Sequence, residues 1–304
     1  MGSIQCGKFK NISKQQITYF SCLLVNRQWC KIIVPILWRQ PKFKNAGFIK
    51  ICLLGLNAEE QRLLIPFKIK FPNTEKRLLF EYLSFIKEIH FNYNLANGIE
   101  SWLSQEGFTF SENFILTIAN SLIKMFLQTS KKLKLSVFDG NILNYAGKNT
   151  VKNIAEALLK NNTLTYLKIY FSQLNSKFWD VFTYYLCTNS SLKFLILSDF
   201  NIGFEDGKKL ANAICNNNTL ASLCLCRNQL GSEGGKAIAD ALCKNTTLTT
   251  LNLITNQLGP EGGKAIADAF CKNTTLTSLN LCDNQLGPEF GKTIKDALCK
   301  NVST

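Results

Sequence analysis

A leucine pattern that recurs every 28 residues in the C-terminal half constrains the fold of this chain more than any other feature. Each copy reads Leu-x-x-Leu-x-Leu, with Ile169 in place of the last leucine of the first copy. Side chains alternate along a strand, so the last two apolar residues of a copy share one face. The three columns are Leu164, Leu192, Leu220, Leu248 and Leu276; Leu167, Leu195, Leu223, Leu251 and Leu279; and Ile169, Leu197, Leu225, Leu253 and Leu281.

The rest of each copy predicts a turn followed by a helix. Gly259-Pro260-Glu261 ends one strand region and begins a helix, because proline fits a first helical turn and an acid favours the helix N-terminus. We expect Asn256 to hydrogen-bond to turning backbone and Asn273 to end the helix in a left-handed conformation. The apolar stripe of this helix is Ala265, Ile266, Ala269 and Phe270.

A strand and helix repeating at this period with this leucine spacing is typical of the leucine-rich repeat. One copy cannot bury its own leucines, whereas stacked copies can, through a parallel sheet with strands about 4.8 Å apart. Degenerate earlier copies are indicated by Ile86-x-x-Ile89-x-Phe91 and by Leu133-x-Leu135, with a helix over 111–127 capped by Ser111. The predicted fold is therefore α/β: a leucine-rich-repeat solenoid over 83–304, with a curved parallel sheet of about seven strands, outer helices, and regular repeats from 164.

Composition narrows the class of protein. The net charge of +14 is concentrated in the first half of the chain. No apolar run is long enough to span a membrane, and residues 1–10 lack the apolar core of a secretory signal. We therefore expect a cytoplasmic or nuclear protein. Cys187, Cys215, Cys243, Cys271 and Cys299 follow the repeat, and we expect them to be reduced, core-facing thiols rather than metal ligands.

A second informative stretch lies near the N-terminus. Apolar spacing within 15–42 predicts two short helices, the second opened or kinked by Pro35. The segments 21–30 (SCLLVNRQWC) and 34–39 (VPILWR) resemble the C-terminal half of the F-box found in fungal F-box/leucine-rich-repeat proteins. The Leu-Pro-x-Glu helix that opens the family's module has no counterpart in Met1–Lys14. We divide the N-terminal part into a basic tail (1–14), truncated F-box-like helices (15–42) and a connector (43–82).

The resemblance implies a partner for each end of the chain. F-boxes of this family bind Skp1, which links them to a cullin ubiquitin ligase, while the repeats hold the substrate. The resemblance therefore implies a substrate-recognition subunit that acts as a protein-interaction scaffold. The implied Skp1-binding residues are Leu23, Leu24, Val25, Trp29, Val34, Pro35, Leu37 and Trp38.

The concave face of the predicted sheet is the expected site for a protein substrate. Aromatic and basic residues gather on its second to fourth strands, and such residues are enriched where interfaces concentrate their binding energy. We also expect Asp199 and Arg227, one repeat apart, to form a pair. The predicted partner-binding residues are Lys132, Lys134, Tyr166, Lys168, Tyr170, Phe194 and Arg227.

The sequence offers no catalytic constellation, so we predict a monomeric binding protein without enzymatic activity, cofactor or metal. The single histidine, His90, is expected at an outward strand position. Two alternatives remain open. One is a regulatory repeat protein without a working F-box, similar to GTPase activators or ribonuclease inhibitors; the other is attachment of the basic N-terminus to nucleic acid or an anionic membrane, which the apolar spacing of both tryptophans disfavours.

Overall fold

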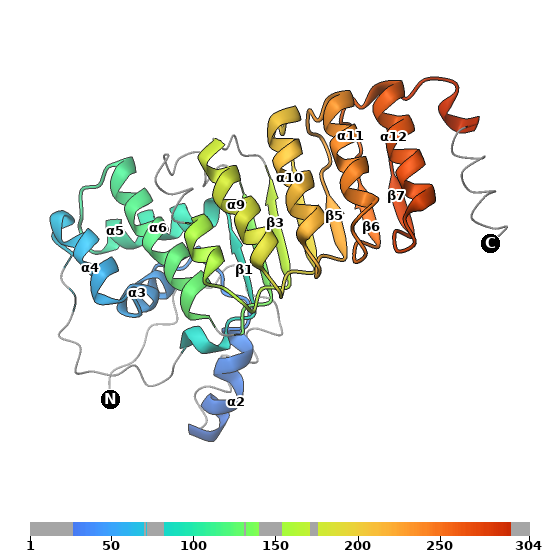
Figure 1. Cartoon of the computed structure of the whole chain (residues 1–304). Helices are drawn as coiled ribbons and strands as arrows, with labels where there is room; N and C mark the ends of the chain where they lie inside the picture. The colour runs from blue at the N-terminus through green and yellow to red at the C-terminus, as the bar shows by residue number, and fades with distance from the viewer. Residues whose placement is uncertain are drawn as a thin grey trace, which may run out of the picture.

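The computed structural model describes residues 27–69, 71, 82–130, 132–139, 154–170 and 176–292. Parallel strands lie on one side of an elongated stack and helices on the other (Figure 1). Within these residues, seven strands form one sheet in chain order, which confirms the solenoid predicted from the leucine period. The strands are β1 Glu88–Phe91, β2 Leu135–Asp139, β3 Tyr166–Tyr170, β4 Phe194–Ser198, β5 Ser222–Cys224, β6 Thr250–Asn252 and β7 Ser278–Asn280.

One or two helices follow each strand on the outer side of the stack. The regular repeats carry α9 Ser176–Thr188, α10 Phe204–Asn216, α11 Gly231–Leu242 and α12 Gly259–Lys272, and residues 154–159 are also helical. Between β1 and β2 the chain forms both α5 Tyr93–Gln105 and α6 Glu112–Thr129, so the longer spacing of the early repeats reflects an extra helix. Ser111 caps α6 as expected, with its side chain accepting from the backbone N–H of Phe114.

The register of β2 differs from the prediction. Ser136, and not Leu133 or Leu135, pairs with Ile89 on one side and Leu167 on the other. Ser136 and Phe138 are the buried strand positions, while Leu135 faces outward. The expected Leu133-x-Leu135 pair was wrong because a serine occupies a leucine position, so Leu133 is the first leucine of the copy and the strand begins later.

Buried asparagines just before β3, β4, β5, β6 and β7 tie successive repeats together. Asn245 donates from Nδ2 to the carbonyls of Ile214 (2.8 Å) and Asn217 (3.0 Å) of the preceding repeat. Its Oδ1 accepts from the backbone N–H groups of Thr247 (3.0 Å) and Leu248 (2.8 Å). Asn273 does the same one repeat later, with extended φ and ψ. The expected left-handed conformation of Asn273 was therefore wrong, since its side chain and not its backbone geometry is what the position requires.

A second asparagine column follows the strands. Asn228 donates from Nδ2 to the carbonyls of Leu197 (3.0 Å) and Leu225 (2.8 Å), and accepts from the N–H groups of Phe200 and Ile202. Asn256 and Asn284 repeat the donor pattern. This confirms the backbone role expected for Asn256. The left-handed residues lie in the turns around this column: Asp199, Asn201, Arg227, Thr255, Gln257, Asp283 and Gln285.

The segment before β1 packs on the first repeats. It contains α2 Arg27–Leu37, α3 Ala46–Leu54, α4 Ala58–Leu64 and the short 3-10 helices η1 Ile65–Phe67 and η2 Tyr82–Phe85. Phe43, Ile49 and Leu64 belong to the same buried cluster as the repeat leucines. Gly98 on α5 permits this contact, because a Cβ there would lie 1.8 Å from the carbonyl oxygen of Phe43.

An ion pair fastens α4 to α6. Lys124 Nζ lies 2.6 Å from Oε1 of Glu60, whose side chain is almost completely buried. The hydrogen bond to Glu60 raises the pKa of Lys124 above its ordinary value. A raised pKa means that the pair's contribution to stability is fully present below the ordinary lysine pKa and is lost as the pH rises above it.

We predict that Asn228→Ala lowers the free energy of unfolding by about 3 kcal/mol, because it leaves buried backbone groups of two repeats without partners. Urea denaturation followed by circular dichroism measures this change. Asn212→Ala, at an exposed position of α10, is the matched control and should change stability by less than about 0.5 kcal/mol. Equal effects of the two substitutions would contradict the role assigned to the asparagine column.

We predict that Gly98→Ala destabilises the protein by about 3 kcal/mol or displaces the connector, because backbone must move to admit the new methyl group. The control is Gly291→Ala, where an added Cβ meets nothing within 4 Å. Thermal unfolding gives the stability change, and limited proteolysis within 43–69 reports displacement of the connector. Wild-type behaviour of Gly98→Ala in both measurements would disprove the close approach.

Candidate functional site

The outward residues of the sheet form columns that the strand register fixes. Tyr166 pairs with Leu135 on β2 and with Phe194 on β4. Lys168 pairs with Val137 and Ile196 in the same way. The expected concave set was therefore partly wrong: Lys132 and Lys134 precede β2, and the outward positions that they were assigned belong to Leu135 and Val137.

Six outward side chains on β2, β3 and β4 make a continuous, largely apolar surface. Phe194 is 45% exposed, and its ring centroid lies 6.1 Å from that of Tyr166. Partial burial raises the pKa of the Tyr166 hydroxyl, with a smaller contribution from Cys224, so this residue is a neutral hydrogen-bonding aromatic at physiological pH. We call this surface the concave patch: Leu135, Val137, Tyr166, Lys168, Phe194 and Ile196.

The later strands present a different surface. The outward residues of β5, β6 and β7 in the Tyr166 column are Ser222, Thr250 and Ser278. Small polar side chains of this kind contribute little to interface hot spots. The concave patch is therefore confined to one part of the sheet.

Arg227 lies in the turn after β5 and not on a strand. Its Nη1 atom is 4.0 Å from Oδ1 of Asp199, the pairing expected from the sequence. At an exposed site such a pair contributes about 0–1 kcal/mol. The side chain of Tyr170, the remaining residue predicted for this face, lies outside the described residues.

Two cysteines at the end of β5 are close together. The Sγ atoms of Cys224 and Cys226 lie 2.8 Å apart. The pKa of Cys226 is raised to about 12, mainly by burial and to a smaller extent by the hydrogen bond with Cys224. This thiol is therefore protonated and weakly nucleophilic at neutral pH. Within the described ranges no group of three or more His, Cys, Asp or Glu could hold a metal. The core-facing position expected for the helix cysteines holds for Cys187 and Cys215, which are partly buried and pack against the hydrophobic core. It was wrong for Cys243, which is exposed; Cys271 is partly buried, and Cys299 lies outside the described residues.

The structure places the F-box-like residues in two environments. Val34 is only 7% exposed. The centroid of the Trp38 ring lies 4.9 Å from that of Phe48 and 4.5 Å from that of Tyr82. Pro35 and Leu37 are half-buried. Leu23, Leu24 and Val25, and the side chain of Trp29, lie outside the described residues.

Among the described side chains of α2, two exposed apolar residues, Ile32 and Ile36, lie outside the predicted Skp1-binding set. Ile32 is 60% exposed and Ile36 is 46% exposed. They lie four residues apart, which places them on one face of a helix. A partner of α2 would meet this face and not Val34. The signal available in the sequence was the helical spacing of Ile32 and Ile36 opposite the buried pair Ile33 and Val34.

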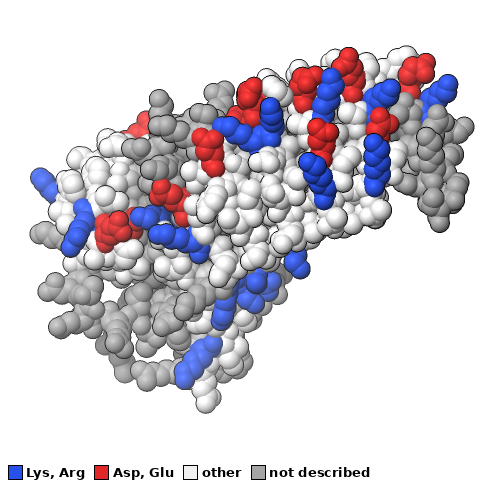
Figure 2. All heavy atoms as spheres, viewed as in Figure 1, with Lys and Arg blue, Asp and Glu red and all other residues white. Residues whose placement is uncertain are grey.

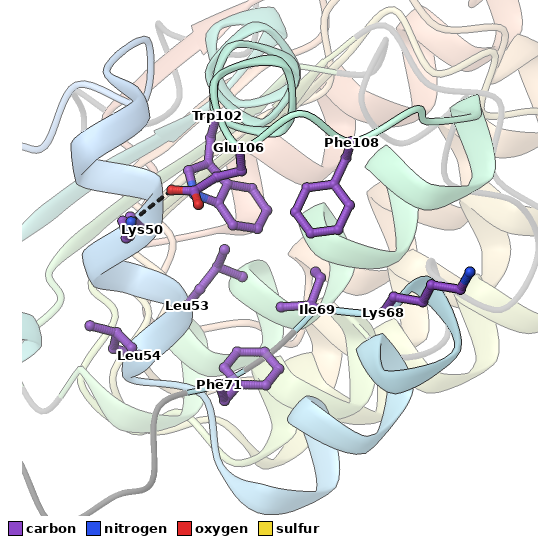
Figure 3. Close-up of a pocket in the computed structure, with 9 residues that line it drawn as sticks. All are labelled: Lys50, Leu53, Leu54, Lys68, Ile69, Phe71, Trp102, Glu106 and Phe108. Carbon is purple, nitrogen blue, oxygen red and sulfur yellow. Dashed lines mark hydrogen bonds and ion pairs between the residues drawn. The ribbon is translucent and has the colours of Figure 1, made fainter.

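A separate cavity of about 420 Å³ lies between the connector and α5 (Figure 3). It is lined by Lys50, Leu53 and Leu54 of α3, by Lys68, Ile69 and Phe71, and by Trp102, Glu106 and Phe108. Lys50 and Glu106 pair across its rim at 2.7 Å, and the buried Trp102 Nε1 has no hydrogen-bond partner among the described residues. The sequence did not predict this cavity, because its walls come from three separate segments.

His90 occupies the expected outward position on β1. Its Nε2 lies 3.3 Å from Nε2 of Gln40, and it is half-buried. No helix in the described ranges combines the length and apolar character that a membrane crossing requires.

Part of the chain is similar to a known protein family. The family model described as "Leucine Rich repeat" matches residues 216–239, 244–267 and 272–289. The repeats are leucine-rich repeats. No curated protein matches the chain. The leucine-rich repeats account for the parallel sheet and its outer helices, and a solenoid of this kind is a protein-binding scaffold.

The solved structures that are similar to part of the chain include the following two. A structure of actin-binding site 2 of leiomodin-1 is 24% identical, covers 49% of this chain and 87% of its own, and has a TM-score of 0.43. The C-terminal domain of tropomodulin from Caenorhabditis elegans is 14% identical, covers 50% of this chain and 93% of its own, and has a TM-score of 0.42.

Proposed function

We propose that this leucine-rich-repeat chain is a monomeric interaction scaffold of the cytoplasm or nucleus that binds a protein partner on the concave patch. The observation that carries the proposal is the pair formed by the exposed Phe194 and the half-buried Tyr166, held among outward Leu135, Val137 and Ile196. Exposed large apolar side chains that lie together mark interaction sites, and tyrosine and other aromatic residues supply much of the binding energy at such sites. The rigid sheet holds them in place before binding, which lowers the entropic cost of association.

We further propose that α2 docks this scaffold on a Skp1-like adaptor of a cullin ubiquitin ligase. The support is the resemblance of 21–30 and 34–39 to half of an F-box, together with the exposed apolar face formed by Ile32 and Ile36. The buried Val34 and the packed Trp38 would hold α2 on the connector rather than touch the adaptor. Binding through α2 would leave the concave patch available to a substrate.

The concave-patch proposal predicts that Tyr166→Ala/Phe194→Ala reduces partner capture by about tenfold or more, because two anchors of the surface are lost. Quantitative mass spectrometry of proteins captured from the source lysate measures this loss. The matched control is Tyr184→Ala/Phe204→Ala, which removes exposed aromatics from the helical side of the stack. Proteins retained by wild type and control but lost by the patch variant are partners. The proposal fails if both variants capture the same proteins as wild type.

The adaptor proposal predicts that Ile32→Asp/Ile36→Asp abolishes binding to purified Skp1, since charges replace the apolar face of α2. Isothermal titration calorimetry with the wild-type chain and both variants tests it. Leu63→Asp/Ile65→Asp serves as the control, because these side chains are similarly exposed near the end of α4. Absence of Skp1 binding by the folded wild type would refute the adaptor role and leave the scaffold proposal intact.

A further inference from the structure

A row of basic residues runs along the edge of the sheet where the strands begin. Backbone hydrogen bonds join its positions: Lys134 N donates to Lys87 O (2.8 Å), Thr165 N to Lys134 O (2.9 Å) and Lys193 N to Thr165 O (2.9 Å). Lys87 N donates to Arg39 O (2.9 Å), which extends the row one position beyond β1. We call Arg39, Lys87, Lys134 and Lys193 the basic ridge.

The charges of the basic ridge are available to a partner. Lys87, Lys134 and Lys193 are exposed, and no ion pair to them is present in the described part of the chain. Arg39 lies 3.5 Å from Glu88 in an exposed pair that contributes little. Figure 2 shows basic side chains gathered along the lower edge of the stack beside α2, without acidic ones between them. Like charges held on neighbouring strands repel one another and create a positive potential that favours an anionic partner.

The basic ridge adjoins the concave patch at Lys134 and Lys193, and Lys87 and Arg39 continue it beyond β2. Lys134 is followed by Leu135, the neutral Thr165 by Tyr166, and Lys193 by Phe194. Because the rise along a strand is about 3.3 Å per residue, these two cations lie directly beside the apolar side chains of β2 and β4. A partner that covers both surfaces must present negative charge next to apolar side chains.

We propose that the basic ridge and the concave patch together bind a peptide segment that carries Asp or Glu beside large apolar side chains. The inference rests on the proposed function, which makes the concave patch the partner's binding site, and it adds the chemistry of that partner. An acidic peptide fits better than single-stranded nucleic acid, because Leu135, Val137 and Ile196 are aliphatic and pack against apolar side chains, and only Tyr166 and Phe194 offer a ring for base stacking. Complementary charge accelerates association and makes it sensitive to salt.

Selection from a phage library of random twelve-residue peptides tests the inference. Wild type is compared with the ridge variant Lys87→Gln/Lys134→Gln/Lys193→Gln and with the control Lys244→Gln/Lys264→Gln/Lys272→Gln. The control removes the same charge from exposed lysines elsewhere. Wild type and control should enrich peptides with acidic residues next to Leu, Phe or Trp, whereas the ridge variant should lose the acidic preference. The best wild-type peptide should bind the ridge variant about tenfold more weakly or worse in fluorescence anisotropy.

Other outcomes would overturn the inference in distinguishable ways. Enrichment of apolar peptides without acidic residues, lost in Tyr166→Ala/Phe194→Ala, would refute the role of the basic ridge and leave the concave patch as a binding site. Equal binding to the ridge and control variants would have the same meaning. Binding of a twelve-nucleotide oligouridine that depends on the ridge lysines, with no peptide enriched, would replace the acidic peptide with nucleic acid. Absence of both peptide enrichment and oligouridine binding would refute the inference, and the capture experiment would then decide the proposed function by itself.

Discussion

Buried asparagine side chains satisfy the backbone groups that stacking of repeats leaves without partners, and the rest of the structure depends on this. Asn245 joins a helix end, the preceding asparagine and the start of the next strand within one set of hydrogen bonds. Asn228 does the same at the other end of a strand. Because unpaired buried polar groups are costly, these two columns fix each repeat relative to its neighbour. The leucine core provides the driving force for stacking, and the asparagines determine its register.

Fixed register sets which side chains form the proposed binding surface. Outward side chains on β2, β3 and β4 come from distant positions in the chain, yet the sheet sets them about 4.8 Å apart on neighbouring strands. No loop has to order itself for Tyr166, Phe194 and Ile196 to form one apolar surface. The same register places Lys134 and Lys193 directly beside that surface. The binding chemistry that we propose is thus a consequence of strand alignment and requires no cleft.

Periodicity predicted the regular repeats well. The strands from β3 onward and α6 with its Ser111 cap lie where the pattern placed them. It failed at β2, because Ser136 occupies a core position and the apolar Leu135 faces outward, so that hydrophobicity pointed to the wrong register. It also failed for Asn273, whose role depends on atoms of the preceding repeat. Of the residues predicted for the concave face, Tyr166, Lys168 and Phe194 lie in the concave patch, while Leu135, Val137 and Ile196 were not among the predicted partner-binding residues.

By itself, the sequence determined that this chain stacks leucine-rich repeats, since a fixed spacing of leucines has no other way to bury them. Only the tertiary structure decided which residues before the regular repeats share a row. Arg39, Lys87 and Lys134 do not follow the 28-residue period, because α3 and α4 lie in one interval between them and α5 and α6 in the other, and backbone hydrogen bonds align them. It also decided that Val34 is buried and Ile36 is exposed on α2. The physical reason is that periodicity reports contacts between equivalent positions, whereas the irregular N-terminal elements are positioned by packing and pairing with parts of the chain that share no period with them.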